Sequence, residues 1–472
     1  MSHRVEEDFL GEMKVPGEAY YGIHTMRAAV NFPVSGISMH PALIRALARV
    51  KQAAALANTG AGLLDRRTGE AIALAAAEVA EGGLAGQFIV DALQGGAGTS
   101  ANMNMNEVLA NRAIEILGGE RGSYQLVHPL KHVNLSQSTN DVYPTALKVA
   151  AIGMVLDLSQ ALAVLQSALQ DREAQFAGVL KLGRTEMQDA VPITLGQSFS
   201  AYAEAVARDR WRLYKVEERL RQVNLGGTAV GTGLNADPRY IFMVIEELRS
   251  LTGYGLARAE NTVDLTQNAD VFAEVSGLLK AAAVNLAKIS GDLRLLSSGP
   301  RGGLGEIRLP RLQPGSSIMP GKVNPVIPEM VAQAAFQVMG NDQVITMAAA
   351  SGQLELNAFL PLIAHNLLQS LDILTNAARL FEEKCVRGIT ADRVRCSRWL
   401  EESQVFITAL TPHLGYDRAA ELVARASREE VPLRKLVVES GLMSEEDLEA
   451  VLAPGQLTSP GVAGAGLLKK GR

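Results

Sequence analysis

Residues 315–325 combine a pair of hydroxyls, a cation and an amide in the sequence Gly-Ser-Ser-Ile-Met-Pro-Gly-Lys-Val-Asn-Pro. Glycine and proline are poor interior residues for helices and strands, so we expect an exposed connection that can face a ligand. A Gly-Ser-Ser sequence alone is more typical of an ordinary polar turn. The addition of Lys322 and Asn324 favours a chemical role for this segment.

A second candidate segment, residues 95–102, reads Gly-Gly-Ala-Gly-Thr-Ser-Ala-Asn and stands before a predicted helix. Glycines let backbone N–H groups approach an anion closely, and Thr99 and Ser100 add hydroxyls near a helix N-terminus. A phosphate-binding loop is the alternative. The Gly-Lys-Ser/Thr sequence of that motif is missing, which argues against it.

Two further polar segments each precede a predicted long helix. Residues 136–141, Ser-Gln-Ser-Thr-Asn-Asp, form a cluster typical of a helix N-cap, with Pro144 in what would be the first turn. A helix N-terminus that caps itself can also attract a carboxylate, so both roles can hold. Residues 183–190, Gly-Arg-Thr-Glu-Met-Gln-Asp-Ala, are predicted to be another polar loop.

The composition excludes several classes of partner. With 45 Lys+Arg against 50 Asp+Glu and no long basic run, the chain is not expected to bind nucleic acid. Cys385 and Cys396 form neither a disulfide framework nor a metal-ligand pattern with the seven histidines, so no metal site is expected. A charged N-terminal segment and the lack of 18 uncharged apolar residues in a row predict a cytoplasmic chain without a membrane span.

The architecture predicted from periodicity is an all-α fold with a long central helix bundle between smaller N- and C-terminal helical domains. The N-terminal domain is predicted at 1–138, with a helix from Asn106 to Leu117, the bundle at 139–390 and the C-terminal domain at 391–472. Because long apolar faces need extensive cover, several chains are expected to share the bundle. The five long helices are expected at about 145–176, 194–223, 266–298, 326–352 and 360–386.

The Gly-Ser-Ser segment closely resembles the sequence mark of the aspartase/fumarase superfamily, whose members eliminate across a carbon–carbon bond to release fumarate. The resemblance extends from about Val5 to Leu457. Argininosuccinate and adenylosuccinate lyases typically carry two basic residues in the Lys-x-Asn-Pro region, whereas Val323 separates Lys322 from Asn324 here. The resemblance implies a homotetramer with a twenty-helix core and active sites that combine loops from three subunits.

The resemblance also implies roles for individual residues. Ser316 matches the catalytic base of the family. Loop amides and a nearby ammonium would stabilise its alkoxide, an ammonium about 4 Å away contributing roughly 4 kcal/mol. No metal or organic cofactor is expected, and the substrate is a small dicarboxylate. Substrate-binding roles are implied for Thr99, Ser138, Thr139, Asn140, Thr185, Glu186, Ser317, Lys322 and Asn324.

Within the superfamily, the aspartase branch is favoured: anti elimination of ammonia from L-aspartate through an aci-carboxylate intermediate. Residues 95–100 and 325–329 are aspartase-like, and Glu186 stands where fumarases carry histidine. A class II fumarate hydratase is the nearest alternative, and a structural protein of the crystallin kind is the distant one. Glu186 is expected to recognise the substrate amino group, with Glu329 able to share its proton; a solvated surface carboxylate is the alternative.

Overall fold

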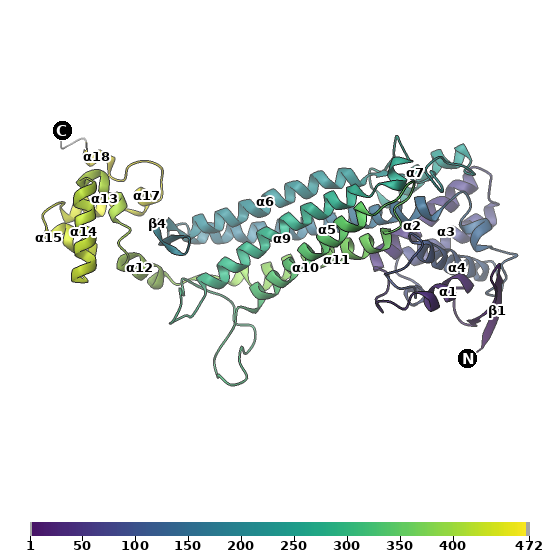
Figure 1. The fold of residues 1–472 in the computed structure, drawn as a ribbon, viewed down its shortest axis with the longest axis horizontal. Coiled ribbons are helices and arrows are strands. Elements are labelled where there is room, and N and C mark those ends of the chain that lie inside the picture. Colours follow the sequence, from purple (N-terminus) through teal and green to yellow (C-terminus); the bar gives the residue numbers. More distant parts are fainter. Residues whose placement is uncertain (1, 469–472) are drawn as a thin grey trace. The chain divides into compact units, whose positions relative to one another are not determined.

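Five long helices form the central bundle of an all-α structure (Figure 1). The computed structural model describes residues 2–468. The prediction of five long helices is confirmed, with the first one starting earlier than expected because Pro144 lies inside it. The helices are α5 (Thr139–Phe176), α6 (Leu195–Leu220), α9 (Asp270–Leu296), α10 (Val326–Ala350) and α11 (Leu360–Lys384).

The chain divides into two units, and each long helix contributes residues to both. The first unit comprises Met1–Gln160, Asp209–Val284 and Ala334–Asn376, and the second comprises Ala161–Arg208, Asn285–Gln333 and Ala377–Arg472. Sequence segments far apart therefore build each unit together. The division into domains at 138 and 390 stays a prediction.

The first unit adds short elements to the long helices. These are β1 (His3–Asp8), β2 (Gly11–Pro16), α1 (Ile23–Asn31), α2 (Pro41–Gly60), α3 (Arg66–Ala80), η1 (Ala85–Gln87), α4 (Thr99–Ile116), the π-helix η2 (Pro129–Val133), β5 (Gln222–Val223), α7 (Pro238–Thr252), β6 (Ala257–Arg258) and α8 (Asp264–Gln267). β1 pairs antiparallel with β2, and β5 pairs parallel with β6.

The second unit contains two small antiparallel sheets and a group of short helices. The sheets pair β3 (Leu180–Thr185) with β4 (Gln188–Thr194) and β7 (Ile307–Arg308) with β8 (Thr390–Ala391). The remaining elements are η3 (Val386–Gly388), α12 (Arg393–Glu402), α13 (Ile407–Leu414), α14 (Tyr416–Glu429), α15 (Leu433–Glu439), α16 (Glu445–Val451), α17 (Pro454–Leu457) and α18 (Ala465–Leu468). A serine caps α16: Ser444 Oγ accepts a hydrogen bond from the Asp447 N–H at 3.1 Å.

Polar side chains fix the register of the long helices inside the first unit. Asp342 of α10 accepts hydrogen bonds from Ser276 Oγ (2.8 Å) and Lys280 Nζ (2.6 Å), both on α9. Asn341, its neighbour, donates to Ser370 Oγ of α11 at 3.0 Å. Because a buried polar group without a partner is costly, these contacts admit only one alignment of the three helices.

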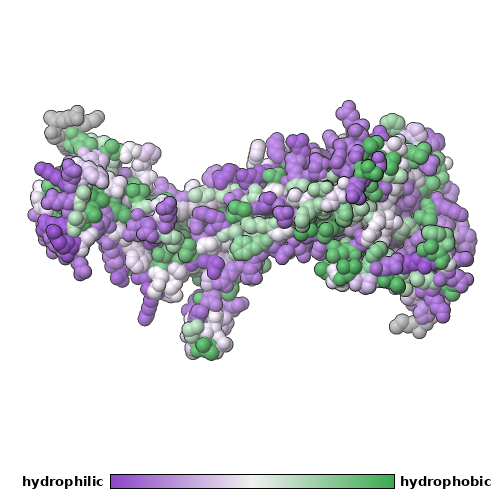
Figure 2. All heavy atoms as spheres, viewed as in Figure 1, coloured by the Kyte–Doolittle hydropathy of each residue, from purple (hydrophilic) through white to green (hydrophobic). Residues whose placement is uncertain are grey.

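The long helices also leave apolar side chains at the surface of the single chain. Phe336 and Met347 on α10 are 62% and 54% exposed, and Val284 on α9 is 51% exposed. Apolar areas accordingly interrupt the polar surface over the long helices (Figure 2). α5 is long and apolar enough to cross a membrane by length and composition, but half of its most apolar stretch is buried in the chain, as in the core helix of a bundle.

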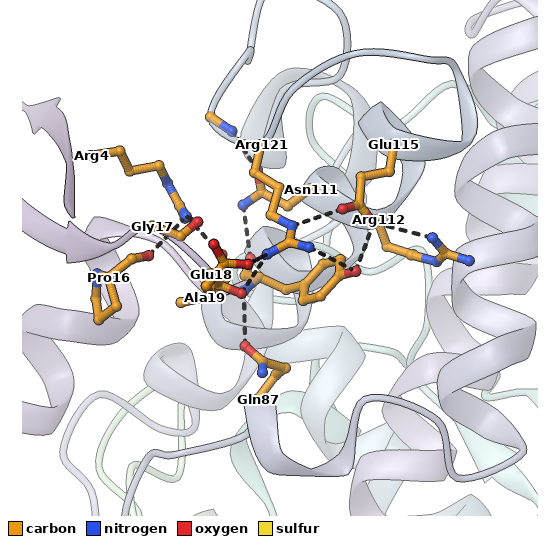
Figure 3. A network of polar contacts seen from close by, with 12 residues as sticks. Arg4, Pro16, Gly17, Glu18, Ala19, Gln87, Asn111, Arg112, Glu115 and Arg121 are labelled. Carbon is orange, nitrogen blue, oxygen red and sulfur yellow. Dashed lines mark hydrogen bonds and ion pairs between the residues drawn. The ribbon is translucent and has the colours of Figure 1, made fainter. Parts of the chain in front are cut away.

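Two arginines hold the chain segment at the end of β2 (Figure 3). Arg4 donates to the carbonyl oxygens of Pro16, Gly17 and Ala19 at 3.2, 3.3 and 2.7 Å. Arg121 donates to the Glu18 carbonyl at 2.6 Å. The two guanidinium groups thus satisfy consecutive backbone acceptors and hold the connection that follows β2.

α4 begins at Thr99, whereas the sequence predicted a helix only from Asn106. The alternation of asparagine and methionine concealed this start, because its asparagines are buried and hydrogen-bonded within the unit. Gly98 caps the helix with φ 96°, in the left-handed region. A Cβ atom there would lie 2.6 Å from Cγ of the buried Tyr143 ring.

Gly98→Ala is therefore expected to destabilise the protein by about 2–5 kcal/mol, the sum of left-handed strain and overpacking. Gly96→Ala is the matched control: it has φ 85°, but its Cβ would lie 3.5 Å from Thr99. That variant should lose only about 1–2 kcal/mol. Equal losses for the two variants in denaturant unfolding would exclude the clash with Tyr143.

Candidate active site

The structure gathers the predicted site residues into two groups, one in each unit. Thr99, Ser138, Thr139 and Asn140 belong to the first unit. The second unit holds Thr185, Glu186, Ser316, Ser317, Lys322, Asn324 and Glu329. Each group has its own supporting hydrogen bonds and its own chemistry.

The first group lies at the N-terminus of α5, where a proline shapes the backbone. Pro144 has no N–H to donate to the Asn140 carbonyl four residues earlier. Asn224 Nδ2 donates to that carbonyl instead, at 3.0 Å. Asn140 Nδ2 donates in turn to the Ala229 carbonyl at 2.7 Å. The segment around residues 224–229 is thereby bound to the start of α5.

Asp141 joins the same two segments from inside. Its carboxylate accepts hydrogen bonds from the N–H groups of Ser138, Gly226 and Thr228, each at 3.0 Å. Burial raises the pKa of Asp141 to about 6, while these hydrogen bonds and the charge of Lys51 act in the opposite direction. Asp141 is thus a structural carboxylate beneath Ser138–Asn140 rather than a ligand-facing group.

The hydroxyl groups near this helix end differ in the direction of their hydrogen bonds. Thr139 Oγ1 accepts from Asn102 Nδ2 at 3.1 Å, and Ser138 Oγ accepts from the Asn140 N–H at 3.2 Å. Both hydroxyl protons can therefore be donated to an anion. Thr99 Oγ1 instead donates to the Gly96 carbonyl at 2.7 Å, so its proton is engaged in this state. The contact between Asn102 and Thr139 brings the segments 95–102 and 136–141 together.

The second group centres on the loop at residues 315–325, which is closed at its neck. The Gly315 N–H donates to the Lys322 carbonyl at 2.8 Å, and Asn324 Nδ2 donates to the Gly315 carbonyl at 2.9 Å. Ser316 is half-buried and Ser317 is exposed. The structure thus confirms an exposed connection at this point of the chain.

Two backbone amides already point at the predicted base. Ser316 Oγ accepts hydrogen bonds from the N–H groups of Ile318 (3.2 Å) and Met319 (2.9 Å). Amide donors aimed at an oxygen stabilise negative charge on it, as in an oxyanion hole. The two amides therefore lower the cost of forming an alkoxide at Ser316.

A cavity of about 1050 Å³ lies beside this loop and carries a surplus of positive charge. Its wall includes Lys322, Asn324 and Glu329 of the predicted residues. A pocket with more cations than carboxylates attracts an anionic substrate, although the whole chain has net charge −5. The charged wall residues are Lys288, Arg294, Arg308, Arg311 and Lys322 against Asp292 and Glu329.

Of these five cations, only Lys322 was predicted from the sequence. Arg308 and Arg311 stand shortly before the loop, and Arg294 lies in the last turn of α9. Arg294 approaches Glu329 at 3.8 Å, and Arg308 pairs with Asp392 at 2.7 Å. The sequence signal was the pair of arginines in Arg-Leu-Pro-Arg just before the Gly-Ser-Ser motif.

Residues 183–190 form a hairpin rather than the predicted loop. Thr185 pairs with Gln188, and the two residues between them, Glu186 (φ 52°) and Met187 (φ 64°), are both left-handed. Positive φ at both positions is typical of a tight type I′ turn, but it usually requires glycine or asparagine. Such strain at an exposed turn favours a functional reason for these residues.

Helix α9 lines one cavity beside the β3–β4 hairpin and another beside the loop at residues 315–325. Thr185 lines a second cavity of about 850 Å³, and Lys288, Asp292 and Leu295 of α9 line both cavities. Within the described residues, no hydrogen bond or ion pair joins Glu186 to Glu329. The described part of the chain also shows no cluster of three or more His, Cys, Asp or Glu residues that could hold a metal ion.

Comparison with known proteins identifies the class. The family described as lyase matches residues 11–340, and the one described as fumarase C C-terminus matches residues 406–459. The chain belongs to this lyase family, the aspartase/fumarase superfamily. Among its relatives, aspartate ammonia-lyase of a Bacillus species is 51% identical over 98% of both chains. That of Bacillus subtilis is 49% identical over 99% of this chain and 98% of its own length.

Two solved structures share the fold. The fumarate lyase:delta crystallin from Brucella melitensis bound to cobalt has a TM-score of 0.94 and 49% identity over 97% of this chain and 100% of its own. The class II fumarase from Schistosoma mansoni has a TM-score of 0.93 and 38% identity, with the same coverage of both chains. These likenesses confirm the aspartase/fumarase-like fold.

Gly315→Ala should open the neck of the loop, because the new Cβ would lie 2.8 Å from the Asn324 N atom and 3.0 Å from the Lys322 carbonyl. Hydrogen exchange of the Gly315 amide should become faster, since its bond to Lys322 is lost. Gly302→Ala is the control, because its Cβ would meet no atom within 4 Å. Unchanged exchange in Gly315→Ala would show that the neck tolerates a side chain.

Proposed function

We propose that this chain is an aspartate ammonia-lyase, a carbon–nitrogen lyase that interconverts L-aspartate with fumarate and ammonia. The observation that carries this proposal is its 46–51% identity, over nearly full length, to proteins named aspartate ammonia-lyase. The polar segments around Thr99, Ser138, Thr185 and Ser316 supply the groups that the reaction needs.

The reaction removes a proton from the carbon beside one carboxylate. The electron pair of that C–H bond moves into the carboxylate, which becomes a doubly charged aci-carboxylate. When this electron pair returns, the carbon–carbon double bond forms and the amino group leaves as ammonia from the opposite face. The catalytic demand is stabilisation of the developing charge, because the carbon acid is very weak.

Ser316 is the base in this proposal. Two amides already donate to its Oγ, and the positive wall of the neighbouring cavity favours the alkoxide further. Lys322 and Asn324 would bind one substrate carboxylate with help from Ser317. Thr99, Ser138, Thr139 and Asn140 would bind the other carboxylate, with Thr185 from the hairpin.

Glu186 would recognise the substrate ammonium, because a carboxylate in a site for a dianion must be offset by a positive charge. Its strained turn holds the side chain at the exposed tip of the hairpin. This contact with the ammonium would favour aspartate over malate as substrate.

We also propose that the protein is a cytoplasmic homotetramer. The two groups of site residues belong to different units, and the long helices expose Phe336, Met347 and Val284. Assembly would cover these side chains, at about 25 cal/mol per Å² of apolar surface. The free, buried thiols of Cys385 and Cys396 suit a reducing compartment.

The second candidate is fumarate hydration to malate, which the class II fumarase of Schistosoma mansoni supports at 38% identity. One assay separates the two reactions. The purified protein is incubated with fumarate and ammonium, and aspartate and malate are both quantified. Aspartate should be the main product. Malate formed as fast as aspartate, or faster, would show that the protein is a fumarase.

Replacing Ser316 with alanine should lower kcat for aspartate at least about a hundredfold, because a positioned proton acceptor is removed. Assembly and thermal stability should be unchanged, since Ser316 lies on an exposed loop. Ser167→Ala, at an exposed serine of α5, is the matched control with normal turnover expected. Turnover of Ser316→Ala near that of the control would eliminate Ser316 as the base.

Mixing two inactive variants tests whether subunits share a site. Ser316→Ala and Ser138→Ala chains, unfolded together and reassembled, should regain part of the activity because some sites receive both intact residues. Each variant reassembled alone should stay inactive. If verified mixed oligomers show no recovery, the two residues act within one chain.

A further inference from the structure

One fully buried lysine lies beneath the proposed carboxylate-binding loop. Lys51 of α2 is 0% exposed, which is rare for a lysine because burial of an ammonium is costly. Its Nζ donates to Asn134 Oδ1 and to Gln137 Oε1, each at 2.9 Å. Burial lowers the pKa of Lys51 to about 7, and the charge of Asp141 opposes this shift. The structure thus keeps an ionisable amine at a position where an apolar side chain would cost less.

The amide oxygen of Asn134 collects three donors. Besides Lys51 Nζ, it accepts from Asn102 Nδ2 and Asn106 Nδ2, both at 3.1 Å. An amide oxygen has two lone pairs, so three donors saturate it. Lys51 is the only ionisable donor among the three and makes the shortest of these contacts.

From Asn134 the network reaches Thr139. Asn102 Nδ2 also donates to Thr139 Oγ1 at 3.1 Å, which directs the threonine proton away from Asn102. Lys51 also acts more directly, because its second acceptor, Gln137, immediately precedes Ser138. Lys51 is thus connected to the loop by two routes.

We propose that Lys51 is a positioning residue for substrate binding: through Gln137, and through Asn134 and Asn102, it holds Ser138 and Thr139 so that both hydroxyls donate to one carboxylate. The inference rests on the proposed function, since it takes a dicarboxylate as the ligand. Lys51 itself does not touch the substrate; it fixes the direction in which its donors point.

The test replaces the lysine by a neutral side chain of similar length. Lys51→Met should raise the KM for aspartate at least about tenfold and lower kcat much less than Ser138→Ala does, because the Ser138 and Thr139 hydroxyls are misaligned rather than removed and the base is untouched. The affinity for succinate, a dicarboxylate that cannot eliminate ammonia, should fall by a similar factor in calorimetry.

Lys148→Met is the matched control. Lys148 is also buried (3% exposed), but its Nζ donates to the Gln222 carbonyl at 2.7 Å and not to Asn134 or Gln137. Both variants should lose thermal stability, and only Lys51→Met should lose affinity for succinate. If Lys51→Met keeps the wild-type KM and succinate affinity while losing stability like the control, Lys51 is merely structural and the proposal fails.

A second pair of variants keeps the test valid if Lys51→Met does not fold. Asn102→Ala breaks the connection to Thr139 and should raise KM in the same way. Asn104→Ala removes an equally buried asparagine of α4, which donates to the Gln87 carbonyl. This variant should keep the wild-type KM. Equal KM values for these two variants would overturn the proposal.

Succinate affinity separates the failure of this inference from the failure of the proposed function. If wild-type protein binds succinate but does not convert aspartate, the proposed function is wrong. The succinate affinities of Lys51→Met and Lys148→Met would still decide whether Lys51 is a positioning residue. If wild-type protein binds no dicarboxylate, both proposals fall. If aspartate is converted and the variants match their controls, only the positioning role is rejected.

Discussion

The structure around the candidate site depends on a hydrogen bond that cannot form. Pro144 lacks the N–H that would bond to the Asn140 carbonyl, and Asn224 takes its place from another part of the chain. Asp141 adds two more bonds to the same neighbouring segment, from Gly226 and Thr228. A local defect in α5 is thus converted into a long-range connection that holds the helix N-terminus in place.

Positive charge is also supplied locally. The chain as a whole is acidic, so attraction of a dianion depends on local surplus, and the cavity beside residues 315–325 provides it with arginines and lysines. At the other group, neutral hydroxyls and a helix N-terminus would do the binding, with the buried side chains of Lys51 and Asp141 behind them. The two ends of a dicarboxylate would therefore meet chemically different surroundings.

The sequence predicted most of the helical architecture, because apolar residues that recur at helical spacing over many turns are typical of a long amphipathic helix and of little else. It missed the start of α5, since Pro144 suggested a boundary, and it missed the start of α4, where buried asparagines broke the apolar pattern. Residues 183–190 looked like a loop because most of their side chains are polar and glycine begins the segment. Periodicity is a local signal, and it also could not show that distant segments build each unit.

Candidate site residues were found where a motif marked them. Lys51 escaped notice because a single lysine within an apolar helix pattern looks like a residue at its edge, whereas the structure buries it completely. Arg294, Arg308 and Arg311 escaped because they belong to the site only through folding. Motifs identify the groups that act, and tertiary structure is required to identify those that support them.

The continuity of the long helices limits how the sequence can change. Each of the five passes from one unit into the other, so its two ends serve different groups of neighbours. Inserting one residue near position 160 of α5 would rotate everything beyond it by about 100° about the helix axis. Side chains that are now buried would face solvent. Loops can vary in length, but between their ends these helices can accept substitutions and hardly any insertion or deletion.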